Sequence, residues 1–539
     1  MRKLYLTVAG AAAIYLSACT KESVFDPNTL IVAPGNDITT LVNLRTDYKI
    51  FLLEPGTYTA LGGQMIRRND IIISKKEPAS EVRIIEPMQI CGDNNIIDGL
   101  TWDGNVNVNL RVSDPGTLAV AGSGNTIRNC IFRNMAISVH GTEIISIGRL
   151  KTGSQFINKA ANHNTIENCT FDTWGLRDEP KGSTKSSTCI SVGQENEKGK
   201  FTGTIIRNNA FLNGPYRQYG YNAAIKVFNS VTLENNLFYG GQECLEIKYG
   251  NSTIRGNTLH HFSGYNILAN RSGTNNLYEN NVVYDVRPVD NRSSAQGFMI
   301  WDAGNTVYRN NLIYDCAQTG LILGKETSGS SLLQYVLIEN NSFIGNSSGI
   351  HFNNQQGSPR HVILAKNIFY GRRTQPMTFM ISGFDPASID YFAANSFYNN
   401  VFFQGDSSSL KEDPQFTDTT DHNYSLNSGS PACGYGAYPC TADSLQTLSR
   451  ALNSPNIIIY PTRIKGLFHI GLAGVDVTPL QLEIIDNSGK PVFRKTFINT
   501  GDQALKLFTN IDLKAQPAGT YIAMIRTASG SFSGPLQVL

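Results

Sequence analysis

Six residues between positions 222 and 301 have the types and the spacing that a site for an acidic sugar requires. Asn222 lies 14 residues before Asn236, and Glu243 lies 14 residues before Asn257; both later asparagines belong to a repeated phrase. We therefore expect Asn222 and Glu243 at one angular position on successive turns of a repeat, about 5 Å apart. Nine or ten residues before such repeated positions, the sequence predicts a neighbouring file formed by Lys226, Lys248, Arg271 and Trp301.

Oxygen ligands beside a file of cations suit β-elimination at a uronic acid. The C5 proton of a uronic acid is held tightly, because the adjacent carboxylate resists further negative charge. A hard cation on that carboxylate removes the repulsion and stabilises the enolate-like intermediate. Ca²⁺ takes several oxygen ligands, which Asn and Glu supply. A lysine kept near other cations loses its proton more readily and can serve as the base.

A repeated phrase must position these residues. Three of its copies are HNTIENCTF (163–171), SVTLENNLF (230–238) and YVLIENNSF (335–343). The apolar/polar alternation predicts a strand, and the Asn pair predicts a turn that tolerates left-handed backbone. The second residue of the pair recurs at intervals of 21 to 40 residues, at positions 130, 169, 209, 236, 257, 281, 311, 341, 367 and 400.

A period with a floor near 21 residues and a variable excess is typical of a solenoid with loops of different length. Stacked coils place each Asn above the last, where the side-chain amides can bond in a ladder. We therefore predict an all-β fold, a parallel β-helix of about ten coils over residues 31–440.

The N-terminus reads as a bacterial lipoprotein signal. A positive start is followed by an apolar run and by Leu16-Ser17-Ala18-Cys19, which predicts a signal over residues 1–18, a lipidated Cys19 and a tether over 19–30. This places the protein on the bacterial envelope or cell surface, at the outer membrane, or in the secreted fraction. The alternative is an ordinary signal peptide with an incidental Cys.

The C-terminal part changes character after a connector over residues 441–455. Longer strands such as Leu480–Asp486 and hairpin spacing predict a small β-sandwich over residues 456–539. This segment resembles the C-terminal sorting domain of the Bacteroidetes type IX secretion system. The alternative is an accessory sandwich that binds carbohydrate.

The charge and the cysteines narrow the classes of partner. The formal net charge is +2, so no global property points to nucleic acid, and an anionic ligand must be bound by a local patch. No Cys or His spacing predicts a zinc site. The oligomeric state is left open by the sequence.

The candidate site itself resembles polysaccharide lyase family 6, which contains chondroitinase B and alginate lyases. The residues that carry the resemblance are Gly220–Lys226, Glu243–Lys248 and Arg271-Ser272-Gly273, with the later stretches Leu337–Phe343 and Gly349–Asn353 and the opening Pro55–Tyr58. The resemblance covers most of residues 30–405 and implies a right-handed β-helix that binds an anionic polysaccharide and uses calcium.

Carried over residue by residue, the resemblance makes Asn222 and Glu243 calcium ligands, Lys248 the base and Arg271 its charge-stabilising partner. Gly241 stands where the family has the first of two glutamates. Glu246 is then the candidate replacement ligand, although it lies three residues beyond Glu243 and shares its face only if the strand bends.

Further substrate contacts are expected around this centre. They come from the cation file and from a loop before Asn222, at Lys226, Trp301, Arg217 and Tyr221.

The predicted function is a lyase that cleaves an alginate or a dermatan/chondroitin-type glycan. A non-catalytic glycan-binding or adhesive lipoprotein on the same scaffold is the alternative, since fold does not fix function and a Glu246/Lys248 pair also suits a plain surface salt bridge. A glycoside hydrolase ranks last, because acidic residues are scarce on the predicted groove strips.

Overall fold

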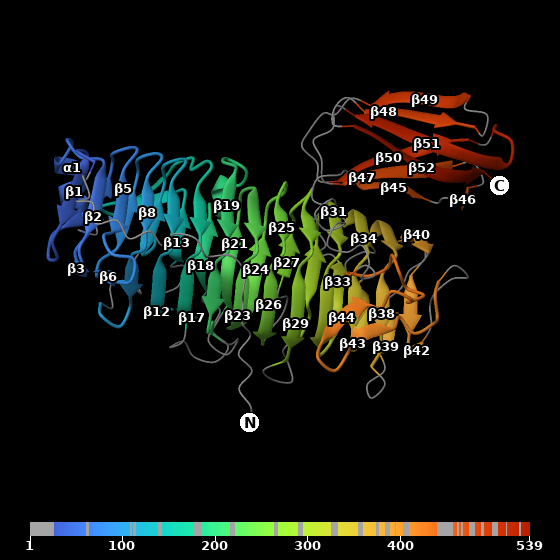
Figure 1. Ribbon diagram of the computed structural model, residues 1–539, viewed down its shortest axis with the longest axis horizontal. Coiled ribbons are helices and arrows are strands. Elements are labelled where there is room, and N and C mark those ends of the chain that lie inside the picture. The colour runs from blue at the N-terminus through green and yellow to red at the C-terminus, as the bar shows by residue number, and fades with distance from the viewer. Residues whose placement is uncertain are drawn as a thin grey trace, which may run out of the picture.

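A computed structural model describes most of the chain and resolves it into a long solenoid and a smaller β domain (Figure 1). The described residues are 26–60, 64–107, 110, 115–137, 143–176, 186–215, 221–263, 268–288, 295–324, 333–353, 359–372, 377–382, 389–393, 395–402, 409–438, 456–460, 463–464, 467–473, 480–486, 490–497, 505–513, 515–527 and 530–538.

Three long parallel sheets run the length of the solenoid, because each coil adds one strand to each sheet. Sheet 1 contains β1 (Thr29–Val32), β2 (Ile50–Leu53), β5 (Ile72–Lys75), β8 (Ile96–Asp98), β11 (Thr126–Arg128), β16 (Thr165–Glu167), β19 (Thr204–Arg207), β22 (Val231–Glu234), β25 (Thr253–Arg255), β28 (Leu277–Glu279), β31 (Gly304–Arg309), β34 (Gln334–Glu339), β37 (Arg360–Ala365) and β40 (Ile389–Ala393).

Sheet 2 contains β4 (Met65–Ile66), β7 (Met88–Ile90), β10 (Leu118–Val120), β13 (Glu143–Ile147), β18 (Ser186–Val192), β21 (Tyr221–Val227), β24 (Glu243–Ile247), β27 (Leu268–Arg271), β30 (Phe298–Trp301), β33 (Thr319–Gly324), β36 (Ser348–Asn353), β39 (Met377–Ser382) and β42 (Asn400–Phe402). Sheet 3 contains β3 (Gly56–Tyr58), β6 (Val82–Ile84), β9 (Thr101–Asp103), β12 (Ile131–Ile137), β17 (Thr170–Leu176), β20 (Ala210–Leu212), β23 (Leu237–Gly241), β26 (Thr258–Phe262), β29 (Val282–Val286), β32 (Leu312–Cys316), β35 (Ser342–Ile344), β38 (Ile368–Tyr370) and β41 (Ser396–Tyr398). The predicted parallel β-helix is confirmed.

The interior is a stack of apolar side chains, one row per strand position. Phe132, Phe171, Phe211 and Phe238 lie in register on sheet 3, with ring centroids 4.6 to 5.0 Å apart. Each ring covers the face of the next, so every coil buries its apolar surface only against its neighbours. The short helix α1 (Ile38–Leu44) lies at the N-terminal end of the solenoid (Figure 1).

The predicted Asn ladder is present between sheets 1 and 3. Asn281 shows the pattern: its side-chain amide donates to Asn311 Oδ1 at 2.9 Å, and its Oδ1 accepts from the amide of Asn257 at 3.0 Å. The residue before each ladder position has left-handed backbone, for example Asn280 with φ 55°. Asn tolerates this conformation, which explains the Asn pair.

The ladder differs from the prediction at its C-terminal end. Asn395, not Asn400, is the last ladder residue, since Asn395 Oδ1 accepts from the backbone N–H of Asn367 at 2.9 Å. Sheets 2 and 3 have 13 strands each, so the solenoid also has more coils than the ten phrases. The first coils use other residues at the ladder position, and Ile131 there follows Cys130 rather than Asn.

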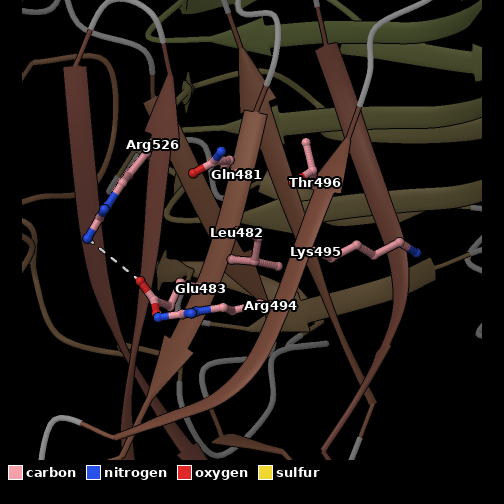
Figure 2. A pocket seen from close by; sticks show the side chains of 7 residues that line it. All are labelled: Gln481, Leu482, Glu483, Arg494, Lys495, Thr496 and Arg526. Atoms are coloured by element: carbon pink, nitrogen blue, oxygen red, sulfur yellow. Dashed lines mark hydrogen bonds and ion pairs between the residues drawn. The ribbon is translucent and has the colours of Figure 1, made fainter.

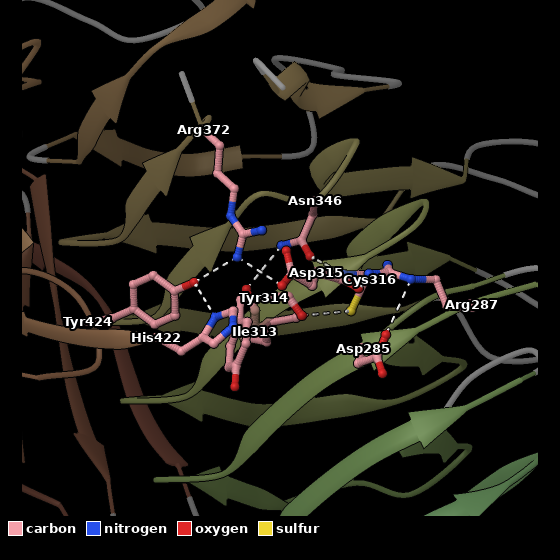
Figure 3. A network of polar contacts seen from close by, with 10 residues as sticks. All are labelled: Asp285, Arg287, Ile313, Tyr314, Asp315, Cys316, Asn346, Arg372, His422 and Tyr424. Carbon is pink, nitrogen blue, oxygen red and sulfur yellow. Dashed lines mark hydrogen bonds and ion pairs between the residues drawn. The ribbon is translucent and has the colours of Figure 1, made fainter. Parts of the chain in front are cut away.

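A closing segment over residues 409–438 packs against the outer face of sheet 3 near its C-terminal end. It contains the antiparallel pair β43 (Phe416–Asp418) and β44 (Asn423–Leu426). Arg372 joins it to the solenoid, with guanidinium nitrogens 2.8 Å from Asp315 Oδ2 and 2.9 Å from the hydroxyl of Tyr424, which also contacts His422 (Figure 3).

The chain ends in the predicted second β domain, which has two sheets. One contains β45 (Asn456–Tyr460), β47 (Leu467–Ala473) and β50 (Leu505–Asp512), and the other contains β46 (Arg463–Ile464), β52 (Gly530–Val538), β51 (Gly519–Thr527), β48 (Leu480–Ile485) and β49 (Pro491–Phe497). On the larger sheet, Glu483 lies between Arg494 and Arg526 in a pocket of about 330 Å³ (Figure 2). No helix in the described part of the chain is long and apolar enough to span a membrane.

Candidate functional site

The candidate site lies on the outer face of sheet 2, on β21, β24 and β27 near the middle of the solenoid (Figure 1). Strand alternation produces it: Ile225, Val227, Leu245 and Ile247 point into the core, so Lys226 and the β24 residues between them point outward.

Three cations converge on one buried carboxylate. Glu246 Oε2 lies 3.5 Å from Lys226 Nζ, and Glu246 Oε1 lies 3.4 Å from Lys248 Nζ and 3.7 Å from Arg271 Nε. Burial opposes ionisation of this carboxyl, but the charges of Lys226, Lys248 and Arg271 prevail and lower the pKa of Glu246. Glu246 is therefore an anion that holds the three cations together.

Glu243 lies beside this cluster on the same side of the sheet. Cys244 and Leu245 both enter the core, so the strand bends there and turns Glu243 and Glu246 to one face. This is the bend that Glu246 needed in order to join Glu243. Burial, and then the negative charge of Glu246, raise the pKa of Glu243 to about 7 in spite of the neighbouring cations. The Glu243 carboxylate makes no hydrogen bond or ion pair with another described residue.

Asn222 is not where the spacing places it. Strands β21 and β24 pair Ala223 with Glu243, so Asn222 is one position out of register. It is fully buried at the corner with sheet 3, near Gly175 of β17, where its Oδ1 accepts from the hydroxyl of Ser187 at 2.5 Å. Its backbone N–H donates to Gln242 Oε1 at 3.3 Å.

A turn of unequal length explains this error. Residues 227 and 247 pair in sheet 2, a separation of 20 residues, whereas residues 232 and 253 pair in sheet 1, a separation of 21. The turn after β24 therefore holds one residue more than the turn after β21. Counting back from the ladder carries this extra residue into sheet 2 and shifts the predicted register by one.

The predicted cation file is corrected in the same way. Lys226 is in register with Glu246 rather than with Lys248. Lys248 follows β24 directly and Arg271 ends β27, where Arg271 is paired with Trp301 of β30 as predicted. The Arg271 guanidinium carbon lies 5.9 Å from the centre of the Trp301 ring.

Three predicted residues are not placed by their side chains. Arg217 and Cys19 lie outside the described residues, and Tyr221 is described by its backbone alone, as the first residue of β21.

The structure also adds residues that the sequence reading missed. Glu195, on the short 3₁₀ helix Glu195–Glu197, places its carboxylate 3.8 Å from Lys248 Nζ, and the ring of Phe228 lies 5.6 Å from the same nitrogen. Phe228 was detectable only with the correct register. Glu195 sits in a turn whose length follows no period, so no pattern pointed to it.

These residues do not fit the predicted calcium site. The three expected oxygen ligands are divided, since Asn222 is bonded inside the corner while Glu243 and Glu246 face outward. The oxygens of Glu246 already have three cationic partners within 3.7 Å. Among the described residues, no group of three or more His, Cys, Asp or Glu side chains is arranged to hold a metal ion.

Comparison with known proteins agrees with the architecture. Residues 222–402 match the family described as "Right handed beta helix region". The solenoid is a right-handed parallel β-helix. No curated protein matches the chain in sequence.

Two solved structures share this right-handed β-helix. One is described as a PL6 alginate lyase in complex with a trisaccharide; it is 16% identical, with a TM-score of 0.50, and the match covers 77% of this chain and 93% of that one. The other is the alginate lyase AlyF-OU02 in complex with G6, at 17% identity and a TM-score of 0.51, covering 78% and 95%. At such identities the likeness establishes the right-handed β-helix fold.

Proposed function

We propose that the protein is a polysaccharide lyase that cleaves a uronate-containing anionic glycan, of the alginate or the dermatan/chondroitin type, by β-elimination. The observation that carries the proposal is the convergence of Lys226, Lys248 and Arg271 on one partly accessible point of the outer sheet. Two proteins with the same fold are described as alginate lyases bound to oligosaccharides, which supports a glycan as the substrate.

In the proposed reaction, the substrate carboxylate sits against Arg271 and Lys226. Their charges stabilise the enolate-like anion that forms when C5 loses its proton. Lys248 takes this proton through Nζ, the C4–O4 bond breaks, and a C4–C5 double bond forms. The departing O4 takes up a proton from the new ammonium group or from water, so the step needs no oxidant or reductant.

Glu246 positions the three cations for this reaction. A carboxylate with a lowered pKa stays charged at neutral pH and keeps Lys226, Lys248 and Arg271 together before substrate binds. The cations also supply the positive charge that calcium would bring, so no step is routed through a metal.

The test is ultraviolet absorbance by the new double bond during incubation with a panel of purified uronate polymers. The proposal requires absorbance to appear with one polymer class and to grow in proportion to enzyme. Binding of a polymer without any new absorbance would favour the alternative, a glycan-binding or adhesive protein, which the pairing of all three cations with Glu246 also permits.

For localisation we propose a lipid anchor at Cys19 on the bacterial outer membrane, with residues 456–539 as a sorting or accessory domain. The support is the order of basic, apolar and small residues before Cys19. Cys19→Ala should move the protein from the membrane fraction to the soluble fraction, and unchanged fractionation would contradict lipidation.

A further inference from the structure

The outer face of sheet 2 carries one continuous row of side chains through the candidate site. Strand register aligns its first seven members, one from each successive strand: Met65, Gln89, Ala119, Ser146, Ser191, Lys226 and Glu246. Neighbouring strands are about 4.8 Å apart, so the row measures how far the accessible surface extends on each side of the cations.

A β-hairpin lies across the first three positions of this row. It consists of β14 (Arg149–Thr152) and β15 (Gln155–Asn158). The side chain of Gln89 clamps it at one residue: Gln89 Nε2 donates to the carbonyl of Lys151 at 3.0 Å, and Gln89 Oε1 accepts from the N–H of Lys151 at 2.7 Å. Both backbone groups of Lys151 are thereby fixed to the outer face of β7.

Apolar packing reinforces this clamp. Leu150 is buried in a small cluster with Met65, Ala119 and Ala121, all from the first three strands of sheet 2. On the outer side of the hairpin, the guanidinium carbon of Arg149 lies 3.7 Å from the centre of the Phe156 ring, and Lys151 Nζ lies 5.4 Å from it. These contacts hold the two hairpin strands together as a stiff unit.

Burial along the row changes abruptly at the candidate site. Ala119 and Ser146 are 0% exposed and Ser191 is 2% exposed, so the row is covered from the hairpin to the strand next to Lys226. Lys226, Lys248 and Arg271 then retain 20%, 27% and 24% exposure of their side chains. Beyond them, Trp301, His351 and Asn353 remain partly exposed on the later strands.

We propose that the binding groove is closed on the β18 side, with the hairpin as its outermost barrier, and open on the β30 side, so that the protein acts on a chain end. This inference rests on the proposed lyase function and specifies its mode as exolytic. A glycan threaded across the cations would need several uncovered strands on both sides, whereas Ser191 is already covered about 5 Å from Lys226.

The experiment follows product size and polymer viscosity against the number of double bonds formed. The wild-type protein should release a single small product from the first time point, while the viscosity of the polymer falls slowly. A ladder of intermediate sizes at early times would overturn the exolytic inference and leave the lyase function standing. Absence of any double bond with every uronate polymer would instead overturn the lyase function and this inference with it.

Two variants test the hairpin itself. Replacing residues 150–157 with a short Gly/Ser link should raise the viscosity loss per double bond several-fold and produce intermediate sizes. Gln89→Ala, which keeps Leu150 in its cluster, should act in the same direction and serves if the deletion does not fold. Gln155→Ala, an exposed change on the same hairpin, is the matched control. Product patterns from a folded deletion identical to those of the wild type would contradict a barrier role for the hairpin.

Discussion

Glu246 and Glu243 are three residues apart and have opposite electrostatic states because their surroundings differ. Glu246 meets three cations at 3.4 to 3.7 Å and stays ionised, while Glu243 is buried without a close cationic partner among the described residues. The residue types that form this site were predictable from the sequence, and so was the pairing of Arg271 with Trp301. The register of Asn222 was not, because one additional residue in a turn is invisible to a count along the chain.

Glu243 should make the stability of the protein depend on pH. Its pKa of about 7 in the folded state lies above the usual value of 4.5, so the folded protein keeps a proton that the unfolded chain releases. Stability should therefore fall as pH rises from about 4.5 to 7. In Glu243→Gln this fall should be smaller by on the order of 2 kcal/mol, measured by denaturant unfolding across that range.

The control for this prediction is Glu77→Gln, an exposed carboxyl on a loop of an early coil, which should leave the pH dependence unchanged. If Glu243→Gln and the wild-type protein lose stability in parallel between pH 4.5 and 7, then Glu243 does not titrate as described.

The response to chelators distinguishes the predicted calcium site from the geometry observed. Because Asn222 is bonded to Ser187 and Glu246 is paired with three cations, we expect a chelator to change the rate of double-bond formation by less than about twofold. Titration of Ca²⁺ followed by calorimetry provides a readout independent of activity. Loss of most of the rate with a chelator, restored by Ca²⁺, would return calcium to the mechanism.

At the scale of elements, strands and turns carry different amounts of information. The strands were predictable because each coil repeats the same alternation and ends in an Asn whose side chain bonds the next coil. The turns were not, because they differ in length from coil to coil. The hairpin β14–β15 is one such insertion, and its position over sheet 2 depends on Gln89, which lies 62 residues earlier.

The ladder predicts a large cost for removing one of its members. Asn281→Ala removes bonds to Asn311 and Ile254 and leaves the donors of Asn257 without their buried acceptor. We expect a loss of about 2–4 kcal/mol in the free energy of unfolding, measured by denaturant titration. Asn105→Ala, an exposed change in an early coil, should cost less than about 0.5 kcal/mol. Equal effects of the two changes would show that the ladder contributes little.

At the scale of the whole molecule, the solenoid separates stability from function. Core rows and ladders hold the coils together along the entire length, whereas the polar site occupies three strands on one outer face. The order of solenoid and terminal β domain was predictable from the change in strand length after residue 455. The closing segment that packs on sheet 3 through Arg372 was not, because its contacts join residues more than 50 positions apart.

The central claim is that Lys248 takes a proton from an anionic glycan on this outer face. Its most direct test is the turnover of Lys248→Ala on the polymer that the wild-type protein cleaves, with Lys200→Ala, an exposed lysine of a neighbouring turn, as the matched control. Loss of the base should lower kcat by at least about 100-fold while unfolding is unchanged, and the control should keep wild-type turnover. Retention of more than about a tenth of wild-type turnover by Lys248→Ala would contradict the assignment.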